Sequence, residues 1–232
     1  MTQRRTGQTW RLSREQADIL LKSSHLATRL TLRPGQLLYQ QGEVGSHFYL
    51  ILSGEVLVSI FEPSGFEMIM EVMGPWALCG EGPAFDGLPR FSTATALRKS
   101  EVLRFDVRRL GPAFAENPAL ALSLLQITAL KQRNLAVRLE YAFGYEPDRR
   151  ILQLIERLAE LYSDPTPEGR LITVQLTHEQ IANMTGTSRV TVTRVLNRLR
   201  RTGAIDVRRG LLLVRAERRG TDTPHPTESR LS

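Results

Sequence analysis

Short apolar segments separated by turn residues fill the first half of the chain. Apolar or alternating runs occupy 30–32, 37–39 and 48–60, with the period that half-buried strands show. Turn residues such as Pro34-Gly35 and Ser53-Gly54 separate these runs. Because many short strands at this spacing are typical of a barrel or a sandwich, residues 1–110 are predicted to form a β-barrel domain.

The pattern becomes helical over residues 113–143. Pro118 lies near the start, where a helix tolerates proline. Apolar positions form two seams, one over 127–141 and one over 125–142. Since a helix that is apolar on two sides must bury both, we expect one side to face the barrel and the other to face the same helix of a second copy. Residues 111–145 are therefore predicted to be a dimerisation helix, and burial of both sides within one monomer is the alternative.

Residues 146–217 carry the pattern of a helix-turn-helix. Thr177 and Gln180 form a capping box at a helix start. Gly186 follows at the distance of a tight turn and can adopt its positive φ. Ser188 is then a natural N-cap for the second helix. This spacing predicts two crossing helices of the kind that bind DNA.

Three further segments complete the second half. Residues 204–214 are predicted to form a hairpin wing, with Arg208-Arg209-Gly210 at its turn. Residues 164–169 are predicted to form a loop. The tail, 218–232, is polar and contains two prolines, so it is predicted to be disordered.

The second helix of the motif divides into a buried and an exposed face. Its buried stripe is predicted to be Val192, Val195, Leu196 and Leu199. The remaining face places an apolar side chain between arginines, which fits a major groove, because arginine forks bind guanine and valine can contact a thymine methyl. The residues predicted to read bases are Arg189, Val190, Thr193 and Arg194. Those predicted to contact phosphates, and so to fix register, are Ser188, Thr191, Arg198, Arg200, Arg201, Arg208 and Arg209. A helical hairpin that binds no nucleic acid is the alternative.

The charge of the chain is concentrated in the same region. Residues 176–220 hold ten arginines and three acids, an excess of seven that equals the formal net charge of +7 of the whole chain. A basic excess confined to one segment is typical of a protein that binds a polyanion. A solvated arginine face would have the same composition.

Several classes of protein and site are excluded by the sequence. Cys79 is the one cysteine, which excludes a disulfide framework and sites built from several cysteines. No apolar run has the length of a membrane span, and the start lacks the apolar stretch of a signal peptide, so we expect a cytoplasmic protein with no membrane partner. The four histidines are isolated in sequence, whereas a cupin-like metalloenzyme needs them clustered, and no catalytic motif is present. We therefore expect no catalytic residue, no metal and no required cofactor.

In this order, the features resemble the CRP/FNR family of transcription regulators over about residues 25–215. The resemblance rests on Pro34–Glu43 (PGQLLYQQGE), on Tyr49–Glu55 (YLILSGE), on Gly80-Glu81 with the later Arg90, and on Gly186–Arg194 (GTSRVTVTR). The last string is similar to that of the nitrogen-control branch. The resemblance implies an α+β fold with an N-terminal double-stranded β-helix or jelly-roll barrel of the cyclic-nucleotide-binding kind, a long dimerisation helix and a C-terminal winged helix-turn-helix. It also implies a homodimer, a palindromic operator with TGT-like half-sites, and RNA polymerase as a partner.

The resemblance also implies an effector site in the barrel. Its expected residues are Gly80, Glu81, Gly82, Ala84, Arg90, Phe91, Leu135 and Ala136. In cAMP-binding members the segment corresponding to 80–90 binds phosphate and ribose, but three of the residues here are apolar where those members have polar groups, and Pro83 removes a backbone donor. Two identities of the effector therefore remain open, a nucleotide such as cAMP and an apolar small molecule. A plain Arg90–Glu81 pair that fastens a loop is the alternative.

Taken together, these patterns predict a homodimeric, effector-gated regulator that binds double-stranded DNA in a sequence-specific way. Two other functions remain open at this point. One is a constitutive DNA-binding regulator with a vestigial barrel, and the other is the cupin-like metalloenzyme.

Overall fold

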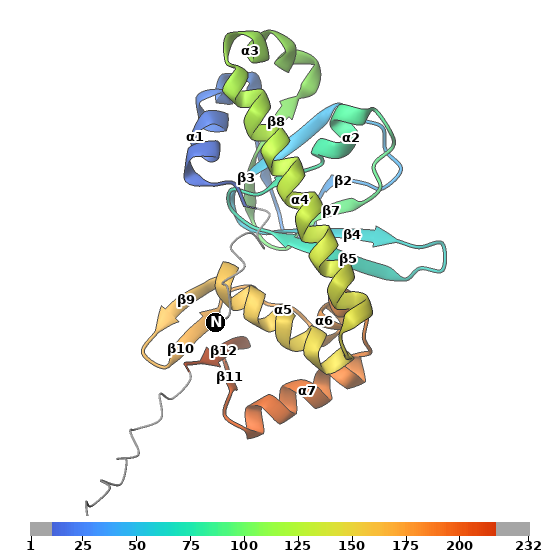
Figure 1. The fold of residues 1–232 in the computed structure, drawn as a ribbon, viewed down its shortest axis with the longest axis vertical. Helices are drawn as coiled ribbons and strands as arrows, with labels where there is room; N and C mark the ends of the chain where they lie inside the picture. The colour runs from blue at the N-terminus through green and yellow to red at the C-terminus, as the bar shows by residue number, and fades with distance from the viewer. Residues whose placement is uncertain (1–10, 217–232) are drawn as a thin grey trace, which may run out of the picture.

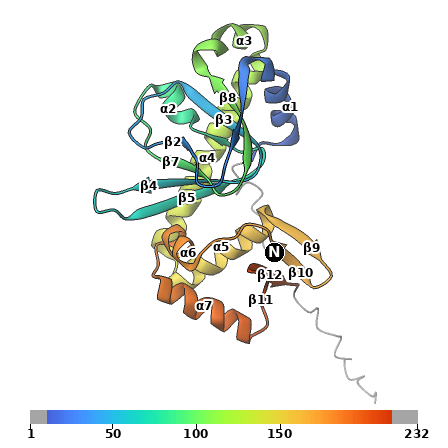
Figure 2. The same cartoon turned by 180° about the vertical axis from the view of Figure 1, so that it is seen from behind.

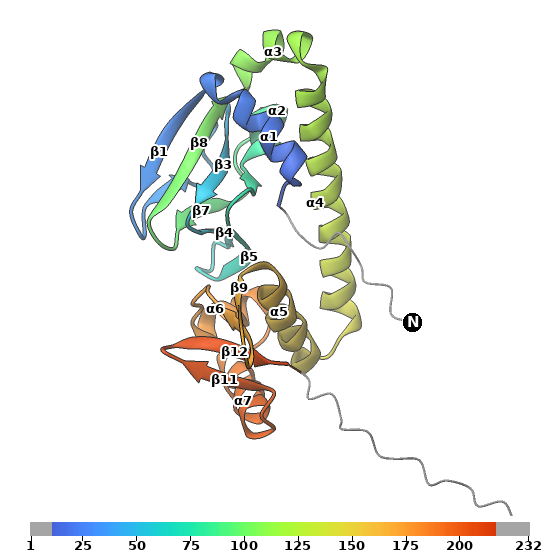
Figure 3. The same ribbon diagram turned by 90° about the vertical axis from the view of Figure 1, so that its left-hand side faces the viewer.

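The computed structural model describes residues 11–216 and has two lobes connected by a long helix (Figure 1). The helix runs alongside both lobes, with the barrel above and the C-terminal lobe below (Figure 3). The tail 218–232, predicted to be disordered, lies outside the described residues.

The N-terminal lobe is built from two four-stranded antiparallel sheets, with strand orders β1-β8-β3-β6 and β2-β7-β4-β5. Tyr49, Ile51, Val56 and Val58 are buried between the two sheets. Phe48 and Phe105 are fully buried on the other face of the first sheet, under the helices that pack on it, and their rings stack with centroids 5.1 Å apart. The β4–β5 hairpin projects from the barrel over α6 (Figure 2). The strands are β1 (Ala27–Leu32), β2 (Leu37–Tyr39), β3 (His47–Ser53), β4 (Val56–Phe61), β5 (Glu67–Met73), β6 (Leu78–Cys79), β7 (Thr93–Ala96) and β8 (Ser100–Asp106).

The barrel domain also contains helices that the strand pattern did not indicate. The expectation of β structure up to residue 110 is corrected by α1 (Arg14–Lys22), α2 (Glu81–Asp86) and two 3₁₀ turns, η1 (Ser24–Leu26) and η2 (Val107–Arg109). Helix α1 begins with a capping box, in which the Ser13 hydroxyl accepts from the Gln16 amide and the Gln16 side chain accepts from the Ser13 amide.

The single helix predicted over 113–143 is two helices, α3 (Leu110–Glu116) and α4 (Pro118–Gly144). Pro118 is the reason: it occupies the first position of α4, where its missing N–H costs nothing. Leu120, Leu124 and Ile127 of α4 pack with Phe48 and Phe105 on one face of the barrel.

The C-terminal lobe contains the predicted helix-turn-helix and a second sheet. Its helices are α5 (Pro147–Leu161), α6 (His178–Thr185) and α7 (Arg189–Arg201). Its sheet has the strand order β11-β12-β10-β9. The predicted loop over 164–169 is wrong, because β9 (Ser163–Thr166) and β10 (Gly169–Ile172) form a hairpin there.

The predicted wing is confirmed as the hairpin of β11 (Ile205–Arg208) and β12 (Leu211–Arg215). Its turn residues, Arg209 and Gly210, have φ values of 52° and 81°, as a two-residue hairpin turn requires. The neighbouring β10 approaches β12 so closely that a Cβ on Gly169 would lie 2.1 Å from the carbonyl oxygen of Val214.

The two lobes share one apolar core. Leu57, Ile69 and Val72 of the barrel pack in the same cluster as the buried residues of α5, α6 and α7. The hydroxyl of Tyr162 donates to the carbonyl of Val72 and accepts from the amide of Gly74, with 3.1 Å between Gly74 N and Tyr162 Oη. The C-terminal lobe is therefore docked on β5.

A buried carboxylate strengthens this docking. Glu71 of β5 is 2% exposed and forms ion pairs with Arg138 of α4, at 3.2 Å, and with Arg157 of α5. Arg138 also donates to the carbonyl of Met70. One acidic side chain thus connects the barrel, the long helix and the C-terminal lobe.

Candidate nucleic-acid interface and effector site

The frame of the helix-turn-helix forms as the sequence predicts. Thr177 and Gln180 make both hydrogen bonds of the capping box. Gly186 ends α6 with a φ of 58°, and the Ser188 hydroxyl caps α7 by accepting from the Thr191 amide at 3.1 Å. Val192, Val195 and Leu196 are buried, and Leu199 is half-buried against the same core.

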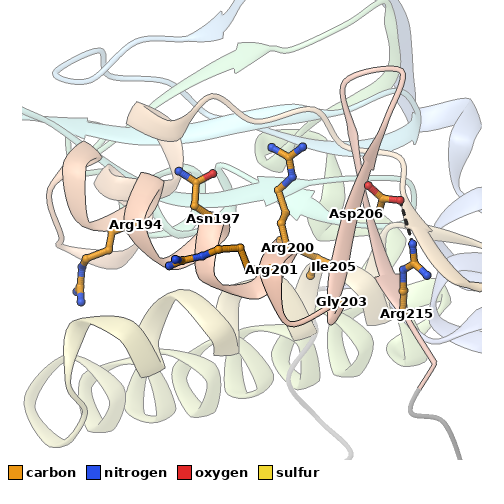
Figure 4. Close-up of a pocket in the computed structure, with 8 residues that line it drawn as sticks. All are labelled: Arg194, Asn197, Arg200, Arg201, Gly203, Ile205, Asp206 and Arg215. Atoms are coloured by element: carbon orange, nitrogen blue, oxygen red, sulfur yellow. Dashed lines mark hydrogen bonds and ion pairs between the residues drawn. The ribbon is translucent and has the colours of Figure 1, made fainter.

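The opposite face of α7 is open to solvent. Val190 is 77% exposed, and Arg194, Asn197 and Arg201 follow it at steps of four, three and four residues, which keeps them on one side of a helix. Asn197 is not among the contacts predicted from the sequence. Between this face and the wing is an open depression of about 770 Å³ (Figure 4). It is lined by Arg194, Asn197, Arg200, Arg201, Gly203, Ile205, Asp206 and Arg215.

The residues predicted to read bases differ in how free their side chains are. Arg189, the first residue of α7, is exposed beside Val190. Thr193 is half-buried, and its hydroxyl donates to the Arg189 carbonyl at 3.0 Å and lies 2.9 Å from His178 Nδ1. A base contact through that hydroxyl would require these bonds to break, so Thr193 is better placed to fix the recognition helix.

The residues predicted to contact phosphates surround this face. Arg200 and Arg201 are exposed at the end of α7, and Arg209 is exposed at the wing turn. Arg208 forms an ion pair with Glu168. The hydroxyls of Ser188 and Thr191 lie 2.9 Å apart at the start of α7.

A carboxylate that sequence reasoning missed binds two of the arginines. Asp148, in the first turn of α5, forms ion pairs with Arg194 at 2.6 Å and with Arg198 at 2.8 Å. The partners are 46 and 50 residues apart in the chain, so no local pattern indicates the contact.

The effector site predicted in the barrel centres on a buried arginine. Arg90 is 3% exposed and donates to the carbonyls of Gly80, at 3.3 Å, and His47, at 2.7 Å. Its guanidinium also lies 4.2 Å from the ring centroid of Tyr39, within cation–π range. Gly80 has a φ of 78°, and a Cβ there would lie 2.6 Å from the guanidinium, so glycine is required.

The partner of Glu81 is a lysine of the long helix. Lys131 donates to Glu81 Oε1 at 2.6 Å and to the carbonyl of Leu78 at 2.7 Å. The alternative of an Arg90–Glu81 pair is therefore wrong for this structure. The second oxygen, Glu81 Oε2, is buried without a hydrogen-bond partner in the part of the chain that the structure describes.

The other predicted effector residues lie in two places. Gly82 and Ala84 belong to α2 with Glu81, and Phe91 is 59% exposed beside them, because a Cβ on Gly82 would be 3.9 Å from the Phe91 ring. Leu135 and Ala136 are exposed on α4. Leu135 lines a mostly apolar cavity of about 390 Å³ between the β4–β5 hairpin, α4, α5 and α6.

The lone cysteine lies next to Gly80 of the predicted effector site. Cys79 is buried, and its burial raises the pKa of the thiol to about 12. The thiol therefore stays protonated at neutral pH and is a poor nucleophile. Packing accounts for this residue.

The described residues, 11–216, contain no group of three or more histidine, cysteine, aspartate or glutamate side chains that could hold a metal ion. None of their helices is long and apolar enough to cross a membrane.

Comparison with known proteins gives the same two parts. The family model of the cyclic nucleotide-binding domain matches residues 29–117, and that of the Crp-like helix-turn-helix domain matches residues 149–218. Both matches fall on the lobes described above.

Similar proteins cover most of the chain. A CRP-like cAMP-activated global transcriptional regulator of Mycobacterium tuberculosis is 32% identical over 70% of this chain and 72% of its own length. A global nitrogen regulator of Synechocystis is 26% identical over 76% of this chain and 80% of its own length. Among solved structures, the c-di-GMP responsive global regulator CLP of Xanthomonas campestris has the same fold, with a TM-score of 0.71 at 18% identity, over 86% of this chain and 99% of that one. The chain therefore belongs to the CRP/FNR family of effector-gated, DNA-binding transcription regulators.

Proposed function

We propose that the protein acts as a homodimer that reads a palindromic operator with TGT-like half-sites and responds to a small anionic effector. The observation that carries the proposal is the exposed face of α7, where Val190 stands in water between arginines. A valine that is 77% exposed buries little apolar surface in the fold, whereas in a major groove it can contact a thymine methyl.

Each residue of this face has a defined part in the proposal. Arg189 and Arg194 bind the O6 and N7 atoms of guanine, and each such forked contact discriminates by about 1–3 kcal/mol against other bases. Val190 reads the thymine between them. The arginines at the end of α7 and at the wing contact phosphates and fix the register.

The dimer is supported by the solvent-facing side of α4. Leu122, Leu125, Leu139 and Phe143 are 56%, 66%, 58% and 88% exposed. Together with the exposed positions between them, they repeat at alternating steps of three and four residues, the spacing of a coiled-coil seam. The full stripe is Leu122, Leu125, Ala129, Gln132, Ala136, Leu139 and Phe143.

The effector is supported by the state of Arg90 and Glu81. Among the described residues, the ion pairs include none to the buried Arg90, so an anionic ligand would supply its counter-charge. Glu81 Oε2 is a buried acceptor that a ligand hydroxyl could satisfy. A nucleotide such as cAMP offers both groups, and the M. tuberculosis relative is described as cAMP-activated.

A specific observation also favours the constitutive alternative. Arg90 is already bound by two carbonyls and an aromatic ring, which is how a structural arginine without a ligand would be held.

The proposed function also implies a location and a further partner. A regulator of transcription acts on the chromosome, so we place the protein in the cytoplasm, with RNA polymerase as a further partner.

Fluorescence anisotropy tests the proposal directly. The probe is a labelled TGTGA/TCACA palindrome at fixed salt, because phosphate contacts make the affinity steeply dependent on salt. Binding is measured with and without cAMP and a panel of other nucleotides. We expect an effector to tighten binding at least about tenfold, a coupling of about 1.4 kcal/mol, and Arg90→Gln to abolish that gain.

The matched control is Arg29→Gln, because the Arg29 side chain is 66% exposed, and this variant should respond as the wild type does. Equal, tight binding by wild type and Arg90→Gln with every nucleotide would establish the constitutive regulator instead. A lack of preference for the palindrome over a scrambled duplex would contradict the assignment of the base-reading residues.

A further inference from the structure

We propose that Asp148 is a specificity-determining residue, because its carboxylate competes with DNA for two arginines of the recognition helix. The proposal deepens the proposed function and rests on the reading of guanine by Arg194. In this view the first turn of α5 takes part in the choice of operator without touching a base.

Both oxygens of Asp148 are engaged, one by each arginine. Oδ1 accepts from Arg194 Nη2 at 2.6 Å, and Oδ2 accepts from Arg198 Nη1 at 2.8 Å. The two arginines are four residues apart on α7, so their side chains are neighbours. The Asp148 side chain is 26% exposed, whereas those of Arg194 and Arg198 are 60% and 45% exposed. Most of the carboxylate is therefore shielded from solvent by the protein, whereas the two guanidinium groups remain accessible to DNA.

The surrounding contacts direct the carboxylate toward α7. Asp148 follows Pro147 in the first turn of α5. The other cations nearby on α5 have partners elsewhere: Arg149 lies 4.2 Å from the ring centroid of Tyr145, and Arg150 donates to the carbonyls of Ala142 and Gly186, each at 3.1 Å. The partners of Asp148 therefore come from the recognition helix.

The competition has different outcomes on different DNA. On a non-operator sequence, each arginine would exchange a carboxylate for a phosphate, which is another anionic oxygen acceptor, so little is gained by leaving Asp148. On the operator, Arg194 gains a forked contact with guanine O6 and N7, whereas Asp148 takes only one of its nitrogens. Asp148 therefore weakens binding to all DNA but weakens non-specific binding more.

The salt dependence of binding makes this difference measurable. An arginine that stays on Asp148 neutralises no phosphate and releases no counterion. Each additional phosphate contact makes the slope of log K against log salt steeper by about 0.9. Removing the charge of Asp148 should therefore steepen the non-specific slope by about 1–2 and the operator slope by about half as much, because on the operator Arg194 binds guanine and only Arg198 can gain a phosphate.

The experiment uses the full chain and the variant Asp148→Asn, which keeps a side chain of similar shape. Anisotropy titrations at several salt concentrations are made on a random-sequence duplex and on an operator selected by the wild-type protein from a randomised pool. We expect non-specific affinity to rise about three- to tenfold and operator affinity to rise less than about threefold. The matched control is Glu160→Gln, an exposed acid on the same helix, about 18 Å along the axis from position 148, for which we expect both slopes to stay at wild-type values.

A second background separates this competition from a structural effect. In Arg194→Gln/Arg198→Gln, adding Asp148→Asn should change neither slope, because the competing cations are gone. A non-specific slope unchanged by Asp148→Asn alone, or equal gains on both duplexes, would overturn the proposal while leaving the regulator itself intact. If the wild type selects no operator from the pool, the proposed function fails, and this inference fails with it.

Discussion

Gly169 begins β10 at a point where the backbone of β12 leaves no room for a side chain. Its φ is 149°, and a Cβ would meet Val214 O at 2.1 Å and the Arg215 Cα at 2.8 Å. Both are backbone atoms, so a flexible side chain cannot move away to relieve the contact. This glycine therefore fixes the register of the sheet that carries the wing.

Gly169→Ala should lower the free energy of unfolding by roughly 2–4 kcal/mol, because it combines overpacking with an unfavourable φ. The measurement is urea unfolding followed by circular dichroism. Gly144→Ala is the comparison: Gly144 is the last residue of α4, has no positive φ and has nothing within 4 Å of its would-be Cβ, so this change should leave the free energy of unfolding unchanged or raise it by up to about 1 kcal/mol. Equal effects of the two changes would contradict this account of the close approach.

At the barrel, the sequence pointed to Arg90 and Glu81 but not to the partners of their side chains. Arg90 and Glu81 were predicted as a site, with a pair between them as the alternative. In the structure, Glu81 pairs with Lys131, and Arg90 donates to backbone carbonyls. Lys131 is 50 residues from Glu81, so its approach depends on where α4 crosses the barrel, which no local spacing encodes.

Among the elements, the long helix α4 has two different faces. Its first half buries Leu120, Leu124 and Ile127 against one face of the barrel, and the opposite side exposes Leu125 and Leu139. In the proposed dimer, this one helix would contact both the barrel and the partner copy, so a change in the barrel could reach the interface.

Leu139→Lys should convert the proposed dimer to a monomer, because it places a charge in the apolar seam. Analytical ultracentrifugation at micromolar concentration measures this, and we expect the dissociation constant to rise at least about a hundredfold. Val44→Lys provides the control, since Val44 is 74% exposed in the loop between β2 and β3 and its replacement should leave the mass unchanged. A dimer that survives Leu139→Lys would place the interface elsewhere.

Elements with strong local signals were predictable, and elements with conflicting signals were not. The capping box at Thr177, Gly186 and the Ser188 cap each determine the end of a helix locally, and all three formed as expected. Strand β9 was missed because Pro165 lies within it. It is the edge strand of its sheet, and proline is tolerated at an edge. Helix α1 had a readable signal, the Ser13 capping box, which the strand pattern after it obscured.

At the scale of the whole molecule, Glu71 is the main polar link between the lobes. Its carboxylate is buried and held by Arg138 and Arg157, which come from different helices. Burying such a charge is costly, and the ion pairs compensate only while both partners are present. A glutamate between apolar residues gives no sequence signal for this role, because its partners are 67 and 86 residues away.

Glu71→Gln should destabilise the protein by about 3–5 kcal/mol, because it removes the buried negative charge that pairs with Arg138 and Arg157. We also expect the thermal transition, measured by calorimetry, to separate into one for each lobe. Glu101→Gln removes a surface ion pair with Arg29 at 3.6 Å and should cost less than about 1 kcal/mol. A single unshifted transition in Glu71→Gln would show that the apolar contacts alone hold the lobes together.

The shared core has a consequence for protein engineering. Regulators of this architecture invite chimeras in which a DNA-binding unit is fused after a foreign sensor. Here the junction cannot be placed simply between α4 and α5, because Leu57, Ile69 and Val72 of the barrel complete the core of the C-terminal lobe. A transplanted unit would expose the apolar surface that these residues cover, so the graft must carry a matching β4–β5 hairpin or have that surface redesigned.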